Sequence, residues 1–287
     1  MSGIITEDRI VPAWLQAMRH LERHDRRDRN ILLEIADPMT VLPNERVAIG
    51  VVDDALRRHQ NLSVQTVAGT IFPYALYKKV GAEKLTDRFL TIMDRAQEPG
   101  TWGTYAMRLM RRAGKTPGSI INPLELVTQK LRRAAGAGKA YTSNYELGVH
   151  DVSDIDEDRA FCEVPLYGAA RDGAMVSNFP CLSHLTFKLV KKRSLELTAI
   201  YRSHYYAQRA LGNLVGLSYL LSFVSAETGI PAGRLTCIST DAHLDYESWG
   251  GVGSGKAVLA GVEAAMKTSP AEPATAVAQS SEVCSPA

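Results

Sequence analysis

Every second residue is apolar in two neighbouring segments, residues 185–189 and residues 195–201. A period of two is typical of a strand that buries one face. The polar run from Lys191 to Ser194 separates the two segments and favours a tight connection. The pattern therefore predicts an antiparallel hairpin whose apolar face lies on the core.

After the hairpin, a period of three to four residues replaces the period of two. Leucines and a valine recur with this spacing over residues 214–224, which predicts the buried stripe of a helix. Gly229, with Pro231 just beyond it, is expected to end that helix. Residues 235–244 return to strand composition, and we expect one continuous strand there.

The segments before the hairpin predict mainly helices. The charge-dense run Arg23–Arg29 mixes both signs and is typical of a solvated turn or an exposed helix face. Asn122 precedes Pro123, and this pair favours the first turn of a helix. The apolar spacing predicts helices around residues 11–21, 47–58, 64–77 with a break near Pro73, 83–96 and 123–133, and strands at residues 31–35, 140–147 and 159–166.

The chain has 287 residues, of which 45% are hydrophobic and 22% are charged, so it can bury a sizeable core. Residues 1–267 are predicted to form one α+β domain, with helices packed on a large mixed or antiparallel sheet. From about residue 268 the composition shifts to Ala, Ser, Pro, Thr and Glu. We expect residues 268–287 to be a disordered tail because they offer little apolar area to bury.

The formal net charge is only +2 and the basic residues are spread along the chain, which does not favour a nucleic-acid or membrane-surface partner. The sequence has no signal pattern and no run of about eighteen apolar residues, so we expect a cytoplasmic protein. The cysteines lack zinc-site spacing and are too few for a disulfide framework, so we expect them to be reduced. They are Cys162, Cys181, Cys237 and Cys284.

Side chains with useful chemistry are expected at the ends of the predicted elements. Cys181 follows Pro180 at the start of the hairpin, and Arg202 ends the paired strand, so the guanidinium can lower the pKa of the thiol. Asn213 offers an amide that can read the edge of a heterocycle. His243 can orient a water or a hydroxyl. Taken alone, Cys181 is interpreted as a core cysteine.

At these residues the sequence resembles the thymidylate synthase family. In that family a Pro-Cys pair begins a strand, an Arg-Ser pair ends the next strand, an Asn opens the central helix and an Asp-x-His closes a later strand. The counterparts here, in the same order, are Pro180–Cys181, Arg202–Ser203, Asn213 and Asp241–His243. This shared order favours a site over a core cysteine at Cys181.

The resemblance implies a one-carbon transfer to C5 of a uracil-type pyrimidine nucleoside monophosphate, on a thymidylate synthase-like fold. Cys181 would add to C6 of the ring, Arg202 would activate the thiol, and Arg202 with Ser203 would hold the phosphate. Asn213 would bind the uracil edge, and His243 would lie near the sugar. The implied donor is 5,10-methylenetetrahydrofolate, and the implied assembly is a homodimer.

A weaker likeness upstream adds further residues. Gly103–Tyr105 resembles a glycine–tyrosine loop of the family, and residues 122–145 resemble the helix and strand that carry its phosphate-binding arginines. The resemblance implies a catalytic role for Tyr105, nucleotide contacts from Asp241 and Lys139, and cofactor contacts from Trp102 and Tyr205. Either of the two cofactor-contact aromatics could instead pack within its own domain.

The sequence also departs from the family. Leu182 stands where the family usually has histidine, Tyr205 where it has aspartate, and Asp245 where it has tyrosine. Two alternatives therefore stay open: C5-hydroxymethylation of the same nucleotide, in which water resolves the exocyclic methylene, and nucleotide binding without turnover. His184 and His204 match no functional position of the family and are interpreted as structural histidines.

Overall fold

The computed structural model describes most of the chain. The described residues are 3–97, 103–114, 116–136, 163–165, 180–190 and 194–268. The predictions that lie outside them concern Trp102, Lys139, Cys162, Cys284, the strand expected at residues 140–147 and the tail beyond Thr268.

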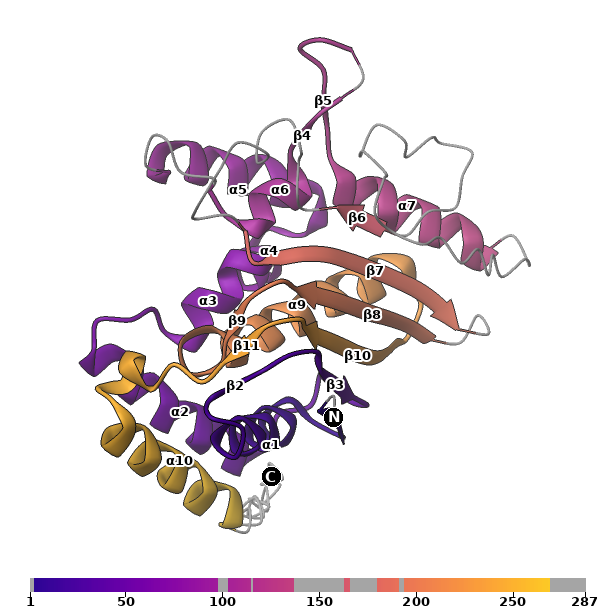
Figure 1. Ribbon diagram of the computed structural model, residues 1–287. Coiled ribbons are helices and arrows are strands. Elements are labelled where there is room, and N and C mark those ends of the chain that lie inside the picture. Colours follow the sequence, from indigo (N-terminus) through magenta and orange to yellow (C-terminus); the bar gives the residue numbers. More distant parts are fainter. Residues whose placement is uncertain are drawn as a thin grey trace, which may run out of the picture.

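A six-stranded sheet forms the centre of the fold (Figure 1). In spatial order its strands are β1 (Ile4–Glu7), β3 (Ile31–Ile35), β10 (Ala232–Ser239), β8 (Ser194–Tyr201), β7 (Leu182–Val190) and β6 (Glu163–Pro165). β1 runs parallel to β3 and β10 runs parallel to β8, whereas the other neighbours are antiparallel. A mixed sheet packed with helices confirms the predicted α+β class.

The helices gather at both edges of this sheet and against it (Figure 1). They are α1 (Ile10–Glu22), α2 (Pro43–Arg58), α3 (Val64–Ile71), α4 (Tyr74–Val80), α5 (Ala82–Ala96), α6 (Tyr105–Met110), α7 (Pro123–Gly136), α9 (Leu211–Thr228) and α10 (Val252–Lys267). Short elements complete the fold: β2 (Arg27–Asp28), β11 (Ala242–His243) and β9 (His204–Tyr205) in one small sheet, β4 (Arg112–Ala113) and β5 (Ile120–Ile121) in another, the π-helical turn η2 (Tyr206–Ala210) and the 3₁₀ turn η3 (Tyr246–Trp249).

α9 is the core helix. Leu214, Leu217 and Leu221 are fully buried, and the helix packs against α3 and against β8 and β10. η2 runs directly into it, so residues 206–228 form one helical segment that is long and apolar enough to cross a membrane. Within the protein, 72% of its most apolar stretch is buried, which is typical of the core helix of a globular fold.

The hairpin and the helix boundaries confirm the sequence predictions. β7 and β8 pair antiparallel, with Leu182 opposite Tyr201. α9 ends at Gly229, whose φ of 71° is left-handed, as a glycine C-cap requires. The side chain of Asn122 accepts the backbone N–H of Glu125 at 3.1 Å, so it caps α7 as expected.

The prediction of one strand over residues 235–244 is wrong. β10 ends at Ser239, and the next strand, β11, belongs to the small sheet β2-β11-β9. Thr240 explains the change of direction, since its N–H donates to the carbonyl of Tyr201 at 2.9 Å and its hydroxyl lies 3.1 Å from the carbonyl of Arg202. These bonds hold the chain against the end of β8 while it leaves the large sheet.

Two other expectations need correction. The run Arg23–Arg29 is not all solvated turn, because its residues Arg27 and Asp28 form β2 and pair with β11. Asn213 lies in the first turn of α9 but does not begin the helical segment, because the preceding π-helical turn already belongs to that segment, and the amide is buried. The sequence pattern missed both features because β2 is too short to show a period and η2 lacks an apolar stripe.

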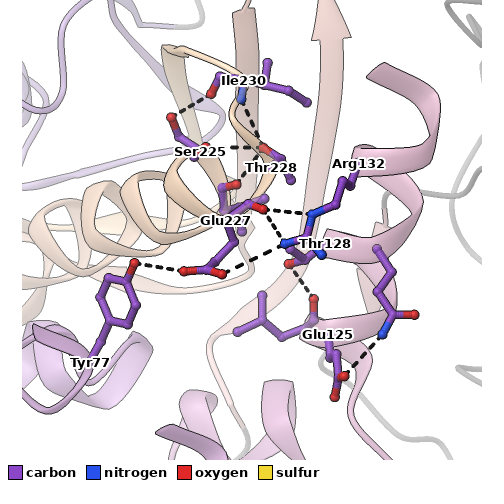
Figure 2. Close-up of polar contacts among 11 residues, drawn as sticks. Tyr77, Glu125, Thr128, Arg132, Ser225, Glu227, Thr228 and Ile230 are labelled. Atoms are coloured by element: carbon purple, nitrogen blue, oxygen red, sulfur yellow. Dashed lines mark hydrogen bonds and ion pairs between the residues drawn. The ribbon is translucent and has the colours of Figure 1, made fainter. Parts of the chain in front are cut away.

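The C-terminal end of α9 is tied to two other helices (Figure 2). The carboxylate of Glu227 accepts the hydroxyl of Tyr77 from α4 at 3.0 Å and lies 3.9 Å from Nη2 of Arg132 from α7. Nε of Arg132 also donates to the backbone carbonyl of Glu227 at 3.0 Å. A cation at this end offsets the partial negative charge of the helix terminus.

Glycine lets α9 approach α3 closely. A Cβ atom on Gly216 would lie 2.7 Å from the backbone carbonyl oxygen of Ala68, and one on Gly212 would lie 2.6 Å from Cβ of Val67. Real Cβ atoms do not come this close to other heavy atoms. The separation of α9 and α3 is therefore set by backbone contact.

Gly216→Ala should lower the free energy of unfolding by about 1–3 kcal/mol, because the added methyl overpacks the α3 contact. The matched control is Gly69→Ala on α3, where a Cβ meets nothing within 4 Å. That change should raise stability by up to about 1 kcal/mol, since alanine favours helix. Urea unfolding of both variants tests the contact, and a Gly216→Ala variant as stable as Gly69→Ala would contradict it.

Candidate functional site

Strand ends meet at one edge of the large sheet. β7 begins and β8 ends there, and the N–H of Arg202 donates to the carbonyl of Cys181 at 2.9 Å. β10 runs parallel to β8, so it ends at the same edge, with Ser239 opposite Tyr201. This topology brings the predicted residues Cys181 and Arg202 together and places Ser203 directly after them.

Tyr105 contacts the backbone at Cys181, the candidate nucleophile. Its hydroxyl oxygen accepts the backbone N–H groups of Cys181, at 3.0 Å, and of Leu182, at 3.2 Å. Tyr105 begins α6, which Thr104 caps by accepting the N–H of Met107 at 3.3 Å. Burial raises the pKa of Tyr105 to about 12, so the phenol keeps its proton.

The thiol of Cys181 is subject to opposing influences. Burial raises its pKa above the ordinary value, while the positive charges of Arg202 and Arg209 act in the opposite direction. The charge of Arg209 likewise opposes the rise in the pKa of Tyr105 that burial causes. The sequence did not predict Arg209 at this site, because its position depends on the π-helical turn η2, which leaves no local pattern.

Asn213 belongs to a buried chain of hydrogen bonds. Its amide nitrogen lies 3.0 Å from Nε2 of His204, and Nδ1 of His204 lies 2.9 Å from the hydroxyl of Ser239. The hydroxyl of Tyr206 lies 3.0 Å from the same hydroxyl. Burial lowers the pKa of His204 to about 3, so the imidazole is neutral at ordinary pH. These four hydrogen-bonded side chains therefore carry no charge.

Tyr201, at the end of β8, packs against this group of hydrogen-bonded side chains. Its ring stacks on the imidazole of His204, with centroids 4.0 Å apart and planes 5° apart. Its hydroxyl is fully buried and has no hydrogen-bond partner among the residues that the structure describes. Burial raises its pKa, and the charged forms of Tyr105 and Cys181 would raise it further. An unsatisfied buried hydroxyl is a polar group that a bound ligand can pair with.

His243 and Asp241, both predicted to bind the nucleotide, lie together on the small sheet. Nε2 of His243 lies 2.9 Å from Oδ2 of Asp241, and Arg27 makes two hydrogen bonds to the same carboxylate, at 2.9 and 2.7 Å. The bond to Arg27 is the main cause that lowers the pKa of Asp241. The ring of Tyr205, 43% exposed, stacks on His243 with centroids 5.3 Å apart. Asp241 therefore positions His243.

Asp245, which replaces the family's tyrosine, caps the helical segment that leads into α9. Its carboxylate accepts the N–H of Ala207 at 2.9 Å and the hydroxyl of Ser248 at 2.8 Å. Burial raises its pKa, and these hydrogen bonds oppose the rise. A carboxylate at this end stabilises the helix because it satisfies free N–H groups and faces the positive end of the dipole.

The described residues also include one group of possible metal ligands away from this edge, in which the ligand atoms of His20, His24 and Asp28 lie within 4.8 Å of one another. These atoms already have hydrogen-bond partners. Nε2 of His20 lies 2.5 Å from Asp28, and Nδ1 of His24 lies 2.7 Å from the carbonyl of His20. These residues therefore form a structural contact between the end of α1 and β2.

Comparison with known proteins points in the same direction as this geometry. No family model matches the chain. Several curated relatives carry the name "Putative thymidylate synthase". That of Methanosarcina barkeri is 35% identical over 146 residues, which is 51% of this chain and 54% of the relative. That of Methanothermobacter marburgensis is 38% identical over 120 residues, 38% of this chain and 52% of the relative.

The chain is therefore similar to several proteins of this name, over about half of their length. It spans about half the length of these two relatives, and 34% of the Methanococcoides burtonii protein of the same name, which is 35% identical over 74 residues. The thymidylate synthase resemblance seen in the sequence is thus confirmed as a similarity to proteins of that name. Its predicted contacts from Trp102 and Lys139 lie outside the described residues.

Tyr201→Phe should raise the free energy of unfolding by about 1 kcal/mol, because it removes a buried hydroxyl that lacks a partner. The matched control is Tyr206→Phe, whose hydroxyl bonds to Ser239, and this change should cost about 1 kcal/mol. Urea unfolding of both variants measures the difference. Equal destabilisation by the two changes would show that the Tyr201 hydroxyl has a partner in the free protein.

Alkylation of Cys181 by iodoacetamide should accelerate as pH rises through a pKa above that of an ordinary thiol, because only the thiolate reacts. Arg202→Gln and Arg209→Gln should each raise that pKa further and slow the reaction at pH 8. Mass spectrometry in a Cys162→Ser, Cys284→Ser background follows the rate, since Cys237 is fully buried.

Arg234→Gln is the control for these variants, because Arg234 lies near the start of β10 and pairs with Glu34 at 3.0 Å. It should leave the alkylation rate of Cys181 unchanged. A rate that does not respond to Arg209→Gln would remove Arg209 from the environment of the thiol.

Proposed function

We propose that the protein transfers a methyl group to C5 of a uracil-type pyrimidine nucleotide through a covalent adduct of Cys181 at C6. The observation that carries the proposal is the surroundings of Cys181. The backbone N–H of Cys181 donates to the hydroxyl of Tyr105. The positive charges of Arg202 and Arg209 favour the thiolate form of Cys181. The buried amide of Asn213 lies on α9, behind the same sheet edge. The family relationship supports the same reading.

In the proposed reaction the thiolate of Cys181 forms a bond to C6 of the ring, and the electrons of the C5–C6 double bond move onto O4. Arg202 and Arg209 favour the thiolate that begins this step. Asn213 donates an N–H to O4, where negative charge develops. C5 then bonds the one-carbon unit that the donor would supply, and loss of the C5 proton and of the donor's amine would give an exocyclic methylene. A hydride added to that methylene would expel the Cys181 thiolate and restore the C5–C6 double bond.

Phosphate and sugar contacts are assigned to residues beside this centre. Arg202 and Ser203 leave the end of β8 as adjacent residues, and a guanidinium is well suited to a phosphate because it can donate two parallel hydrogen bonds. His243 is held by Asp241 at a fixed orientation, with its ring beneath Tyr205. Such a fixed imidazole is suited to hydrogen-bond a sugar hydroxyl.

5,10-Methylenetetrahydrofolate is the proposed donor, and it would supply the one-carbon unit and the hydride that methylation needs. The described surface offers it Tyr205, whose ring is 43% exposed and backed by His243. An exposed, supported aromatic ring fits the flat heterocycle of such a donor. Tyr205 would hold this heterocycle by stacking, in place of the family's aspartate.

A second candidate is nucleotide binding without turnover. It is favoured by the raised pKa of the Cys181 thiol, which keeps the nucleophile protonated in the free protein. C5-hydroxymethylation, the third candidate, differs from methylation only in the step after transfer, where water takes the place of the hydride. The product mass separates these two transfer reactions.

The proposed assembly is a homodimer that packs sheet against sheet. On the face of the sheet opposite the buried residues, Leu32, Ile238 and Ile200 lie side by side across β3, β10 and β8. All three are only partly buried. A row of apolar side chains at this position supports a protein partner on that face, since β-sheets bury apolar faces against another layer.

Incubation with 5-fluoro-dUMP and methylenetetrahydrofolate should give a covalent adduct on Cys181. The reaction removes a proton from C5, and the fluorine that replaces this proton cannot be removed, so the adduct is trapped. Intact mass should show the adduct in the native protein and its absence in Cys181→Ala. The ribonucleotide analogue, run in parallel, identifies the sugar that the site accepts.

Cys237→Ala is the control for this experiment, because the thiol of Cys237 is fully buried and should not form the adduct. Measurable nucleotide binding without an adduct from either analogue would contradict the proposed transferase activity and would support nucleotide binding without turnover. Failure to bind either analogue would contradict both.

A further inference from the structure

His204 is a buried histidine to which neither the family pattern nor the proposed reaction assigns a role. A neutral imidazole carries one donor and one acceptor nitrogen. In the structure the amide nitrogen of Asn213 faces Nε2, so Nε2 accepts, and the proton on Nδ1 is donated to Ser239. No hydrogen bond engages Oδ1 of Asn213 from any described residue.

The direction of this chain decides what Asn213 presents to a ligand. With one N–H committed to His204, the amide keeps Oδ1 and its second N–H. This pair complements uracil, whose N3–H donates and whose O4 accepts, whereas cytosine presents the reverse order at the same two positions. Turning the amide over would require the opposite tautomer of His204, with its proton on Nε2.

We propose that His204 is a positioning residue that fixes the direction of the Asn213 amide and thereby selects uracil over cytosine. This inference rests on the proposed function, which supplies the pyrimidine nucleotide.

The imidazole is held on several sides. Tyr201 stacks on its face, and the backbone N–H of His204 donates to the carbonyl of Asp241 at 2.9 Å. His204 and Ser239 are 1% and 0% exposed. Because no water reaches these atoms at such burial, a lost hydrogen bond cannot be replaced by solvent. The tautomer is therefore coupled to the direction of the amide.

Ser239→Ala tests this coupling without touching Asn213 or His204. It removes the acceptor of the Nδ1 proton, and a buried N–H without an acceptor is tolerated less well than a bare acceptor. The imidazole proton should move to Nε2, and the amide should turn its Oδ1 toward His204. Calorimetric titration with UMP, dUMP, CMP and dCMP then measures the base preference.

The unmodified protein should bind uracil nucleotides more tightly than cytosine nucleotides. In Ser239→Ala that ratio should fall by about tenfold, the equivalent of one hydrogen bond. His204→Phe keeps a flat ring against Tyr201 but removes both nitrogens, and it should lose the preference by a similar factor. Ribose 5-phosphate, which lacks a base, should bind all of these proteins equally, which shows that the phosphate site is intact.

His184→Phe is the matched control. His184 lies on β7, is only half-buried and contacts Thr186 at 2.8 Å, outside the buried chain. It should change neither the base preference nor the binding of ribose 5-phosphate. An unchanged uracil preference in both Ser239→Ala and His204→Phe would overturn the positioning role.

A second readout does not depend on nucleotide binding. ¹⁵N chemical shifts of the His204 ring should report a neutral imidazole with its proton on Nδ1, and in Ser239→Ala a proton on Nε2. A proton on Nε2 in the unmodified protein would overturn the inference. If no pyrimidine nucleotide binds, the proposed function fails, while the tautomer still shows whether His204 directs the amide.

Discussion

The hydrogen bond from the N–H of Arg202 to the carbonyl of Cys181, 2.9 Å long, is the contact on which the candidate site depends. It closes the β7–β8 hairpin at the end where both strands meet the loops, so a thiol and a guanidinium that are far apart in the sequence become neighbours. Thr240 then attaches the end of β10 to the same place by bonding to the carbonyls of Tyr201 and Arg202. The proximity of Cys181 and Arg202 at this edge is a consequence of strand pairing.

The same edge combines charged and uncharged chemistry in adjacent regions. Near Cys181, two arginines oppose the effect of burial on the thiol. Around Asn213, a neutral histidine and two hydroxyl groups satisfy one another without any net charge. A neutral chain is compatible with the apolar packing of α9, since an ion buried at this depth would need a partner of opposite charge. The candidate site therefore has its charged groups near Cys181 and its uncharged hydrogen bonds around Asn213.

The sequence predicted the parts of this arrangement that repeat along the chain. The alternation of apolar residues located β7 and β8, and the helical period located α9 and its end at Gly229. The contributions of Arg209, His204 and Ser239 were not predicted, because they depend on a π-helical turn and on the register between β8 and β10, which leave no local pattern. The likeness to a family supplied residue order, whereas side-chain direction required the three-dimensional structure.

Gly212 and Gly216 have a consequence that reaches beyond the packing of α9. Gly212 immediately precedes Asn213 and rests on Val67 of α3, so the height of the amide above the sheet is set by a helix more than 140 positions earlier in the chain. The contact with α3 is so close that a single added methyl group at either glycine would change the distance between the two helices. A larger residue at Gly212 would therefore move the amide of Asn213 as well as the backbone of α9.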